Sequence, residues 1–285
     1  MANERVGAAV TLHPLVTRVL AGNASPFTYT GTQTHLVGRD ALAVIDPGPD
    51  DADHLAALLA AIGGRPVAAM MVTHTHRDHS PLAARLRDVT GAPVVGCAPL
   101  TMDDAGPRAD AAFDVDYRPD RVLNDGDVVE GDGWTLQAIA TPGHTSNHLA
   151  FSLPQAQAMF SGDHVMGWST TIVSPPDGDM GDYMASLEKL IGREERVYFP
   201  AHGDPVDNPQ RLVRGMLGHR KQREGQILRL LARAPADTVT MVDAMYAGID
   251  ARLKPAAQRS VLAHLFDLRR RGAVHEGEGA LWHVA

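Results

Sequence analysis

Apolar runs alternate with segments of helical periodicity through the first third of the chain. Residues 41–45 and 66–72 are short apolar runs, a pattern that is typical of strands buried on both faces. Residues 51–62 place leucines three and four positions apart, which predicts a helix with one apolar face. A second helix is expected over 81–89 and a third strand over 92–97. The alternation predicts a sheet that is covered by helices.

The pattern changes to short strands and turns between residues 121 and 159. Residues 124–127 read Asn-Asp-Gly-Asp and residues 131–133 read Gly-Asp-Gly, and both are turn sequences. The apolar run 134–140 follows directly. These features predict antiparallel hairpins, and they are followed by a helix that we expect over 183–191.

The last part of the chain predicts helices followed by a hairpin. Residues 204–209 read as a linker, and Pro209 suits the first turn of a helix. The expected elements are a helix from Pro209 through Leu231, helices over 242–247 and 256–271, and a hairpin over 273–284. Three helices and a hairpin form a winged-helix pattern. We therefore expect two domains, residues 1–208 and residues 209–285.

Composition sets limits on the class of protein. The chain has 285 residues, enough for a buried core in one large or two smaller domains. Cys97 is its only cysteine, so no disulfide can form within the chain, and its apolar neighbours indicate a core residue. No run reaches the ~18 apolar residues of a membrane span. His13 and Arg18 interrupt the apolar residues near the N-terminus, so we expect a cytoplasmic protein without a membrane partner.

Charge is distributed unevenly along the chain. Residues 220–285 carry 11 Lys and Arg against 7 Asp and Glu, whereas the remainder carries 15 against 27. An acidic body repels polyanions, and a mildly basic C-terminal part weakly attracts them. Three consecutive arginines at 269–271 fit a solvated helix end better than a nucleic-acid patch. This balance favours a small substrate over a nucleic acid.

The segment His74-Thr75-His76-Arg77-Asp78-His79 carries the densest chemistry in the chain. Four metal-capable side chains occupy six positions, directly after the apolar run that ends at Val72. Imidazole and carboxylate suit a borderline cation such as zinc. His74 and His76 lie two apart on an extended segment and point to the same side, whereas Asp78 and His79 turn toward a second position. One segment can therefore serve two adjacent metal ions.

Three further candidates follow other predicted strands. His144 comes after the run 134–140, Asp163 follows Phe160-Ser161-Gly162, and His202 follows Val197-Tyr198-Phe199-Pro200-Ala201. Each stands beside glycine or proline at a strand end, where loops on a rigid sheet can bring side chains together. The combination is a stronger indication of a metal site than the first segment alone.

These four segments together resemble the metallo-β-lactamase fold superfamily, which includes glyoxalase II and RNase Z. The resemblance implies an α/β fold, a four-layer αββα sandwich, followed here by the small winged-helix domain. It also implies two metal ions per chain, zinc by ligand type, although iron or manganese would also suit the site. The implied ligands are His74, His76 and His144 for the first metal, Asp78, His79 and His202 for the second, and Asp163 as the bridge between them.

A closer resemblance covers nearly the whole chain. Residues 23–38 are similar to the first hairpin of the lactamase-β-like hydrolases, and residues 219–224 to the helix that leads into that group's winged-helix domain. The group includes animal mitochondrial endoribonucleases and many bacterial proteins of unassigned substrate. After His79 this chain has Ser80-Pro81, where many relatives have a turn that contains glycine. The difference leaves the ligands untouched and concerns the start of the next helix.

The implied chemistry is hydrolysis by a binuclear zinc site. Two cations about 3.5–4 Å apart can hold one bridging hydroxide and polarise an electrophile. Zinc lowers the pKa of its bound water to about 7, so hydroxide is available at neutral pH. Asp78 is the catalytic candidate, because it can orient the hydroxide and take its proton. The expected substrate is a small carbonyl compound, namely a thioester, ester, lactone or β-lactam-like amide.

Other side chains are expected around the metals. Asp46 stands at a strand end and resembles the superfamily's aspartate that supports the metal loop, and His148 lies four residues after His144. Each could instead be an ordinary turn or core residue. Substrate-groove walls are expected from the first hairpin and from the long loop over 167–182, and the residues are Tyr29, Thr30, Trp168 and Thr170.

Three alternatives stay open. The chain could be an endoribonuclease that cleaves single-stranded RNA, as the closer resemblance suggests. It could be a mononuclear iron dioxygenase, which would use only the first metal site. It could be a non-catalytic protein that binds through its winged helix, although none of the seven ligand positions is lost. The same domain could also cover a sheet edge or form a homodimer contact.

Overall fold

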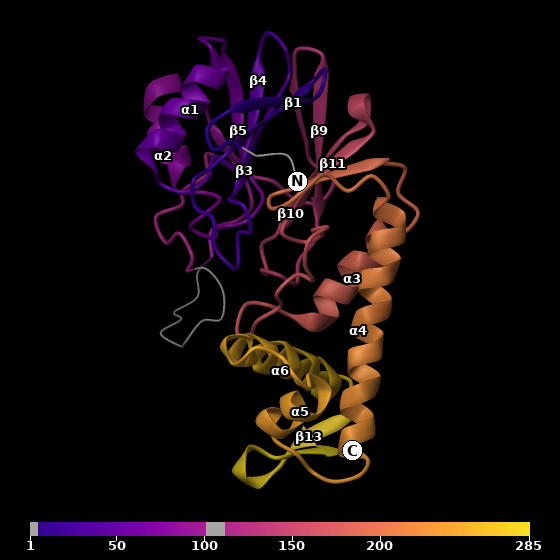
Figure 1. The fold of residues 1–285 in the computed structure, drawn as a ribbon. Helices are drawn as coiled ribbons and strands as arrows, with labels where there is room; N and C mark the ends of the chain where they lie inside the picture. The colour runs from indigo at the N-terminus through magenta and orange to yellow at the C-terminus, as the bar shows by residue number, and fades with distance from the viewer. Residues whose placement is uncertain (1–4, 101–111) are drawn as a thin grey trace.

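Seven strands form the first sheet in a computed structural model, which describes residues 5–100 and 112–285 (Figure 1). The strands follow one another in chain order across the sheet. They are β1 (Ala9–His13), β2 (Val16–Leu20), β3 (Gln33–Val37), β4 (Leu42–Ile45), β5 (Val67–Val72), β6 (Val94–Gly96) and β7 (Arg121–Val122). β1 to β4 pair antiparallel, whereas β4 to β7 pair parallel. Parallel neighbours need crossovers, and helices α1 (Ala52–Ile62) and α2 (Leu82–Thr90) supply two of them.

The second sheet contains five strands in the order β12-β11-β10-β9-β8. They are β8 (Val128–Gly131), β9 (Trp134–Ala140), β10 (Leu149–Leu153), β11 (Ala158–Gly162) and β12 (Val197–Pro200). β8 to β11 pair antiparallel, as the turn sequences predict. β11 and β12 pair parallel, and helix α3 (Met180–Leu190) lies in their connection.

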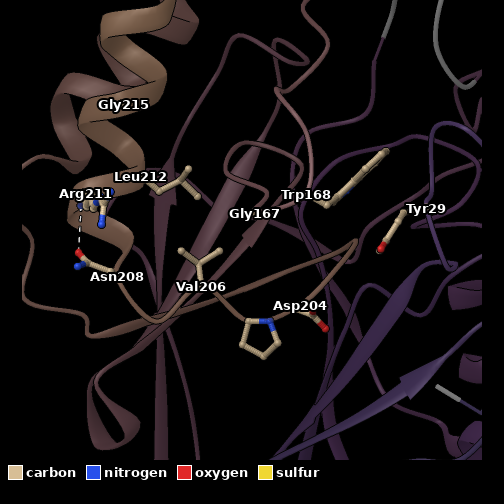
Figure 2. A pocket seen from close by; sticks show the side chains of 10 residues that line it. Tyr29, Gly167, Trp168, Asp204, Val206, Asn208, Arg211, Leu212 and Gly215 are labelled. Atoms are coloured by element: carbon tan, nitrogen blue, oxygen red, sulfur yellow. Dashed lines mark hydrogen bonds between the residues drawn. The ribbon is translucent and has the colours of Figure 1, made fainter. Parts of the chain in front are cut away.

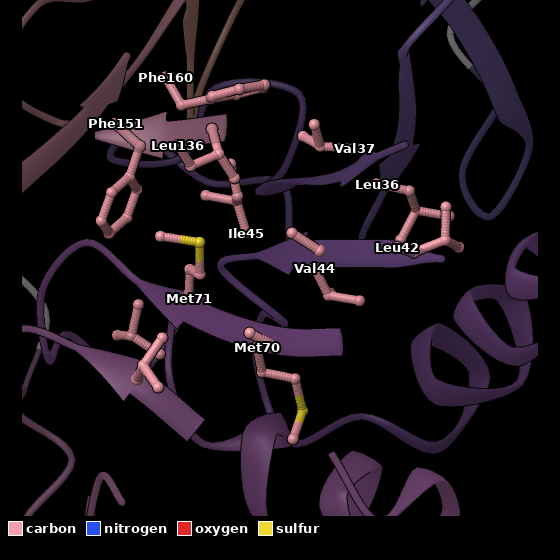
Figure 3. Packing of buried hydrophobic residues seen from close by; sticks show 14 of the residues in the cluster. Leu36, Val37, Leu42, Val44, Ile45, Met70, Met71, Leu136, Phe151 and Phe160 are labelled. Carbon is pink, nitrogen blue, oxygen red and sulfur yellow. The ribbon is translucent and has the colours of Figure 1, made fainter. Parts of the chain in front are cut away.

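Apolar side chains between the two sheets form the main core. Phe151, Phe160 and Leu136 of the second sheet face Ile45 and Met71 of the first (Figure 3). All five are at most 1% exposed. Burial of a side chain of this size contributes about 1.5–3 kcal/mol. Val44 and Met70, which alternate with Ile45 and Met71 along β4 and β5, are also fully buried, so these two central strands are buried on both faces.

Helices cover the outer face of each sheet. Leu58 of α1 and Leu86 of α2 are fully buried in the core of the first sheet. Tyr183 and Leu187 of α3 pack with Met159 of the second sheet in a separate apolar cluster. The layers are therefore helix, sheet, sheet and helix, which confirms the predicted αββα sandwich.

The C-terminal part is a small domain with its own core. Its elements are α4 (Pro209–Leu231), α5 (Thr238–Met245), α6 (Lys254–Arg270) and the antiparallel pair β13 (Val274–Glu276) and β14 (Trp282–Val284). Ile227, Met241, Val261 and Trp282 are among the buried residues that join them. Three short 3-10 turns, Pro154–Ala156, Ala251–Leu253 and Glu278–Ala280, complete the regular structure of the described residues. The predicted winged-helix pattern is confirmed.

Three helices begin earlier than predicted: α6 by two residues, and α3 and α5 by more. In α3 and α5 an aspartate explains the difference. α3 begins at Met180 rather than 183, where the Asp179 carboxylate accepts from the Asp182 amide at 2.9 Å. α5 begins at Thr238 rather than 242 and ends at Met245, and Asp237 caps it. An aspartate at the N-cap satisfies a helix amide that would otherwise have no partner.

Helix α4 belongs to both cores. Its first half packs Val213 and Met216 against α3, and its second half packs Ile227 into the C-terminal domain. α4 runs from beside the second sheet to the far end of the molecule (Figure 1). The helix begins at Pro209, but the domain boundary between 208 and 209 stays a prediction because α4 serves both parts. None of the helices within the described ranges is both long and apolar enough to cross a membrane.

Candidate metal centre

Loops at the ends of four strands bring the predicted ligand residues together. The segment 74–79 follows β5 of the first sheet, whereas the other three residues follow β9, β11 and β12 of the second. The candidate donor atoms form two groups, and within each group all atoms lie within 4.8 Å of one another. The first group is His74, His76, His144 and Asp163, and the second is Asp78, His79 and His202.

The first group contains three imidazoles and one carboxylate oxygen. His76 Nδ1 lies 3.0 Å from His74 Nε2 and 3.1 Å from His144 Nε2. Asp163 Oδ2 lies 3.5 Å from His144 Nε2 and 4.0 Å from His74 Nε2. These are all buried side chains.

The second group shares Asp163 with the first. Asp78 Oδ2 lies 3.3 Å from His79 Nε2 and 3.2 Å from His202 Nε2. The other oxygen of Asp163, Oδ1, lies 3.7 Å from His79 Nε2 and 3.3 Å from His202 Nε2. One oxygen of Asp163 therefore faces each group.

These separations fit metal ions. Two ligands at about 2.0–2.1 Å from a tetrahedral zinc lie about 3.3 Å from each other. Asp163 Oδ1 and His79 Nε2 are buried, and neither makes a hydrogen bond of good geometry within the described residues. Buried polar atoms normally have a partner, and a cation between the groups would supply it. The cluster is therefore a histidine and aspartate site for divalent metal.

Asp46 organises the loop that follows β5. Its carboxylate accepts from the Thr73 amide and hydroxyl, both at 2.8 Å, and from His79 Nδ1 at 3.0 Å. Thr73 Oγ1 in turn lies 3.0 Å from His74 Nδ1. The Nδ1 atoms of both histidines are thus occupied, which leaves Nε2 for the metal. Asp46 also has a φ of 48°, an unusual backbone conformation for a non-glycine residue that concentrates at functional sites.

Backbone carbonyls orient two of the three remaining histidines, His144 and His202. His144 Nδ1 donates to the Ile172 carbonyl at 2.7 Å, and His202 Nδ1 donates to the Gly31 carbonyl at 3.2 Å. Both rings are therefore held with Nε2 toward the centre. Every residue type has a backbone carbonyl, so sequence patterns could not have identified Ile172 or Gly31 as the acceptors.

His148 supports the centre from behind. Its Nε2 accepts from the Asp163 amide at 3.2 Å, and its Nδ1 therefore donates to Thr141 Oγ1 at 2.8 Å. The ring is buried and fixes the start of the loop that carries Asp163. Thr32, which sequence reasoning missed, donates its hydroxyl to Asp78 Oδ2 at 3.0 Å.

Electrostatics divide the histidines into two kinds. Burial, reinforced by neighbouring histidines, lowers the pKa of His74 and His76 well below the usual value, so both rings are neutral. Burial also acts to lower the pKa of His79 and His202, but nearby carboxylates outweigh it. They raise the pKa of His202 to about 10 and that of His79 well above its usual value. A bound cation would displace those protons.

The carboxylates respond in the opposite sense. Burial would raise the pKa of Asp78 and Asp163, but His79 and His202 outweigh burial and hold both well below the usual value. Both side chains are therefore ionised at neutral pH. Asp163 is buried and Asp78 is largely buried, and neither pairs with a lysine or arginine in the described residues. Their negative charge therefore has to be balanced by protons on the histidines or by bound metal.

A pocket of about 710 Å³ adjoins the loop that follows His202, and Asp204 of that loop lines it (Figure 2). The Tyr29 and Trp168 rings stack at its edge with centroids 4.9 Å apart. Trp168 packs on Gly203, the residue after His202: a Cβ there would lie 2.7 Å from the indole. The remaining lining residues are Gly167, Asp204, Pro205, Val206, Asn208, Arg211, Leu212 and Gly215.

Two of the four predicted groove residues therefore line a pocket. Thr30 and Thr170 are not among its lining residues, and Thr170 is exposed. Their role as groove walls stays a prediction. The catalytic role of Asp78 and the assignment of individual ligands to each metal also stay predictions, although the geometry is compatible with them.

Family models match both parts of the chain. The model described as the metallo-beta-lactamase superfamily matches residues 29–202, and the beta-lactamase associated winged helix domain matches residues 238–282. The first match includes every residue of the metal cluster.

Related proteins span most of the chain. An atrochrysone carboxyl ACP thioesterase from Aspergillus fumigatus is 32% identical over 85% of this chain and 73% of its own length. A beta-lactamase-like protein 2 homolog from Caenorhabditis elegans is 30% identical over 92% of this chain and 87% of its own length.

Solved structures share the fold over the full length. A beta-lactamase domain protein from Burkholderia ambifaria has a TM-score of 0.79 at 20% identity and covers all of this chain and 96% of that one. A metallo-beta-lactamase family protein from Thermus thermophilus has a TM-score of 0.78 at 22% identity over 96% of this chain and all of that one. With its cluster of histidines and aspartates and its C-terminal winged helix, the chain belongs to the metallo-beta-lactamase superfamily and is a metal-dependent hydrolase.

Proposed function

We propose that this protein is a binuclear zinc hydrolase that cleaves a small carbonyl substrate, with a thioester as the leading class. The observation that carries the proposal is the position of Asp163. Its two oxygens face two separate groups of donors, each at distances that suit one ion. Imidazole nitrogen with carboxylate oxygen is a ligand set that zinc accepts readily.

Two zinc ions bound there would supply a nucleophile at neutral pH and polarise the carbonyl oxygen of the substrate. The chain's own contribution to proton transfer falls to Asp78. Its Oδ2 is engaged by Thr32 and lies beside His79 and His202, whereas Oδ1 makes no hydrogen bond within the described residues. Asp78 Oδ1 can therefore take the proton of the attacking water and pass it to the leaving group.

Hydrolysis of a thioester needs only water as a second reactant. Water oxygen forms a bond to the carbonyl carbon, and the carbon–sulfur bond breaks. The sulfur leaves with the proton that Asp78 held, so the products are a carboxylic acid and a thiol. An ester or a lactone reacts in the same way, with oxygen as the leaving atom.

Three observations support a carbonyl substrate over a polyanion. The pocket next to the loop after His202 is walled by aromatic and apolar side chains such as Trp168, Val206 and Leu212, and among the described lining residues Arg211 alone is cationic. Many arginines and lysines of the C-terminal domain are already paired, for example Arg252 with Asp250. One relative of 32% identity is named a thioesterase.

Endoribonuclease activity is the second candidate. The observation in its favour is the Tyr29 and Trp168 pair, because stacked aromatic side chains at a pocket edge can hold nucleic-acid bases. The mononuclear iron alternative has less support, because the second donor group is complete. A non-catalytic binding protein would not need the hydrogen bonds that orient His79, His144 and His202.

The first experiment measures metal content on protein purified without added metal, together with hydrolysis of a thioester, a lactone, a chromogenic β-lactam and single-stranded RNA. We expect about two zinc ions per chain and a thioester activity that a chelator abolishes and zinc restores. RNA cleavage faster than any carbonyl hydrolysis would replace this proposal by the second candidate. One iron per chain with oxygen consumption would overturn both.

The pocket's role is tested with a matched pair of variants. Tyr29 and Phe27 are both exposed aromatics on one loop, but only Tyr29 lines the pocket. We expect Tyr29→Ala to raise KM about ten-fold for thioesters with long acyl chains and much less for acetyl thioesters, with Phe27→Ala unchanged. An equal KM change in both variants would mean that the pocket does not receive substrate.

A further inference from the structure

The segment between β11 and α3, residues 163–179, lies against the metal centre on one side. It begins with Asp163, and the carbonyl of Ile172 accepts from His144 Nδ1 at 2.7 Å. Thr171 Oγ1 donates to the Asp163 carbonyl at 2.8 Å and so ties the middle of the segment to its start. We refer to residues 163–179 as the bridging segment.

The bridging segment also holds the loop that carries His144. The Asp177 carboxylate accepts from the Ser146 amide at 3.1 Å and from its hydroxyl at 2.5 Å. The Asp179 amide donates to the Gly143 carbonyl at 2.9 Å. His144 is thus held through its own ring and through residues on both sides of it, so a displacement of the bridging segment would displace this ligand.

Three arginines from the C-terminal helices contact the opposite side of the bridging segment. Arg220 of α4 donates to the Thr171 carbonyl. Arg259 of α6 donates to the Pro175 carbonyl and, at 3.2 Å, to the Ser174 hydroxyl. Arg270, near the end of α6, binds both oxygens of Asp179 at 2.7 and 2.9 Å, and its hydrogen bonds lower the pKa of that carboxyl.

Arg220 is the most informative of the three. It is 4% exposed, lies over the Tyr183 ring at 5.1 Å, and has no carboxylate within ion-pair distance in the described ranges. A buried cation without a counter-ion is costly, so its position needs a compensating role. Its partner carbonyl belongs to Thr171, the residue directly before the one that orients His144.

We propose that the arginines of α4 and α6 are positioning residues for the metal centre, which gives the winged-helix domain a role in metal binding. Arg220 and Arg259 hold the carbonyls at 171 and 175 toward the C-terminal helices. The carbonyl between them, at Ile172, is thereby held toward His144. The domain then sets the geometry of the first donor group without contributing a ligand to it.

The test compares variants of one helix by zinc competition against a chromophoric chelator, with the full chain. Arg259→Gln removes contacts to the bridging segment. Arg269→Gln is the matched control, because Arg269 contacts Glu276 and the rings of Phe266 and Trp282 within the C-terminal domain. The thermal midpoint of each variant shows whether it is folded.

We expect Arg259→Gln to weaken one of the two zinc-binding steps about ten-fold, the lower end of the range for lost hydrogen bonds around metal-bound histidines. Arg259→Lys should recover part of the affinity, and Arg269→Gln should keep it. Arg220→Met should weaken the same step and is a second, independent variant. Zinc affinity within two-fold of the parent in both Arg259→Gln and Arg220→Met, with the variants folded, would overturn the proposal.

The zinc-affinity test of the arginines can fail or succeed independently of the proposed hydrolytic activity. Metal affinity is measured without any substrate, so a protein that binds zinc but hydrolyses none of the substrates would refute only the proposed function. A weakening that Arg269→Gln reproduces would refute only the positioning role, because the loss would then follow from general destabilisation of the C-terminal domain.

Discussion

Replacement of Gly143 by alanine is predicted to damage the metal centre through a steric clash. Gly143 has a φ of +132°, and a Cβ added there would lie 2.3 Å from both Cα and N of Tyr183. Ordinary contact begins at about 3.4 Å, so the two backbones must separate by about 1.1 Å. Tyr183 belongs to α3 and is fully buried, so the loop of His144 has to move instead.

The expected loss follows from that displacement. A misplacement of about 1 Å at a reacting group can cost about 100-fold in rate, and the unfavourable φ adds about 1–3 kcal/mol of strain. We expect Gly143→Ala to lower kcat/KM about 100-fold and to lower zinc content from two ions toward one. Zinc content and hydrolysis of the substrate found for the parent protein are measured together, with the unfolding midpoint.

Gly133→Ala is the control, because Gly133 also has a positive φ, +76°, but a Cβ there meets no atom within 4 Å. Gly133 lies in the turn between β8 and β9. The Gly133→Ala variant therefore measures the effect of backbone strain without a steric clash. The reasoning would be refuted if Gly143→Ala kept two zinc ions and a rate within two-fold of the parent. It would also fail if Gly133→Ala lost as much activity.

Other predictions concern single side chains. His76→Ala should abolish hydrolysis while far-ultraviolet circular dichroism stays unchanged, and full unfolding would make the metals structural. Asp163→Asn should weaken both zinc-binding steps in a chelator titration, and unchanged stoichiometry and affinity would exclude a bridge. Burial and nearby cations such as Arg220 lower the pKa of His264 to about 3, so the unfolded chain binds the extra proton as pH falls below about 6.5. The contribution of His264 to the free energy of unfolding is fully present above that pH. Between pH 7.5 and pH 5.5, protonation of this residue in the unfolded chain should lower the free energy of unfolding by about 1.4 kcal/mol. Urea unfolding should show that His264→Gln loses less unfolding free energy than the parent over this pH range, by about that amount. An equal loss in the two proteins would contradict the low pKa of His264.

The strands and long helices were predictable because their patterns are local. β9 occupies the predicted residues 134–140, and α4 runs from Pro209 to Leu231 as expected. The largest errors lie at the starts of α3 and α5, where one capping carboxylate decides the first turn. Asp237 starts α5 four residues before the apolar stretch on which the prediction relied.

The metal cluster was predictable for a different reason. Histidine and aspartate at strand ends are recognisable by type, and the four loops that carry them lie at strand ends in two facing sheets. The residues that orient them were less visible. Ile172 acts through its backbone, and Arg220 reads in the sequence as one more cation of a polar helix, whereas the structure buries it.

Each donor group draws atoms from both sheets. In the first, His74 and His76 come from the loop after β5, whereas His144 and Asp163 come from the second sheet; in the second, His202 faces Asp78 and His79. A metal ion in either group therefore acts as a cross-link between the two halves of the sandwich. Binding to the folded state alone stabilises it in proportion to the logarithm of the free metal concentration. The supply of metal in the cell would then set how long the folded chain survives, as well as how fast it works.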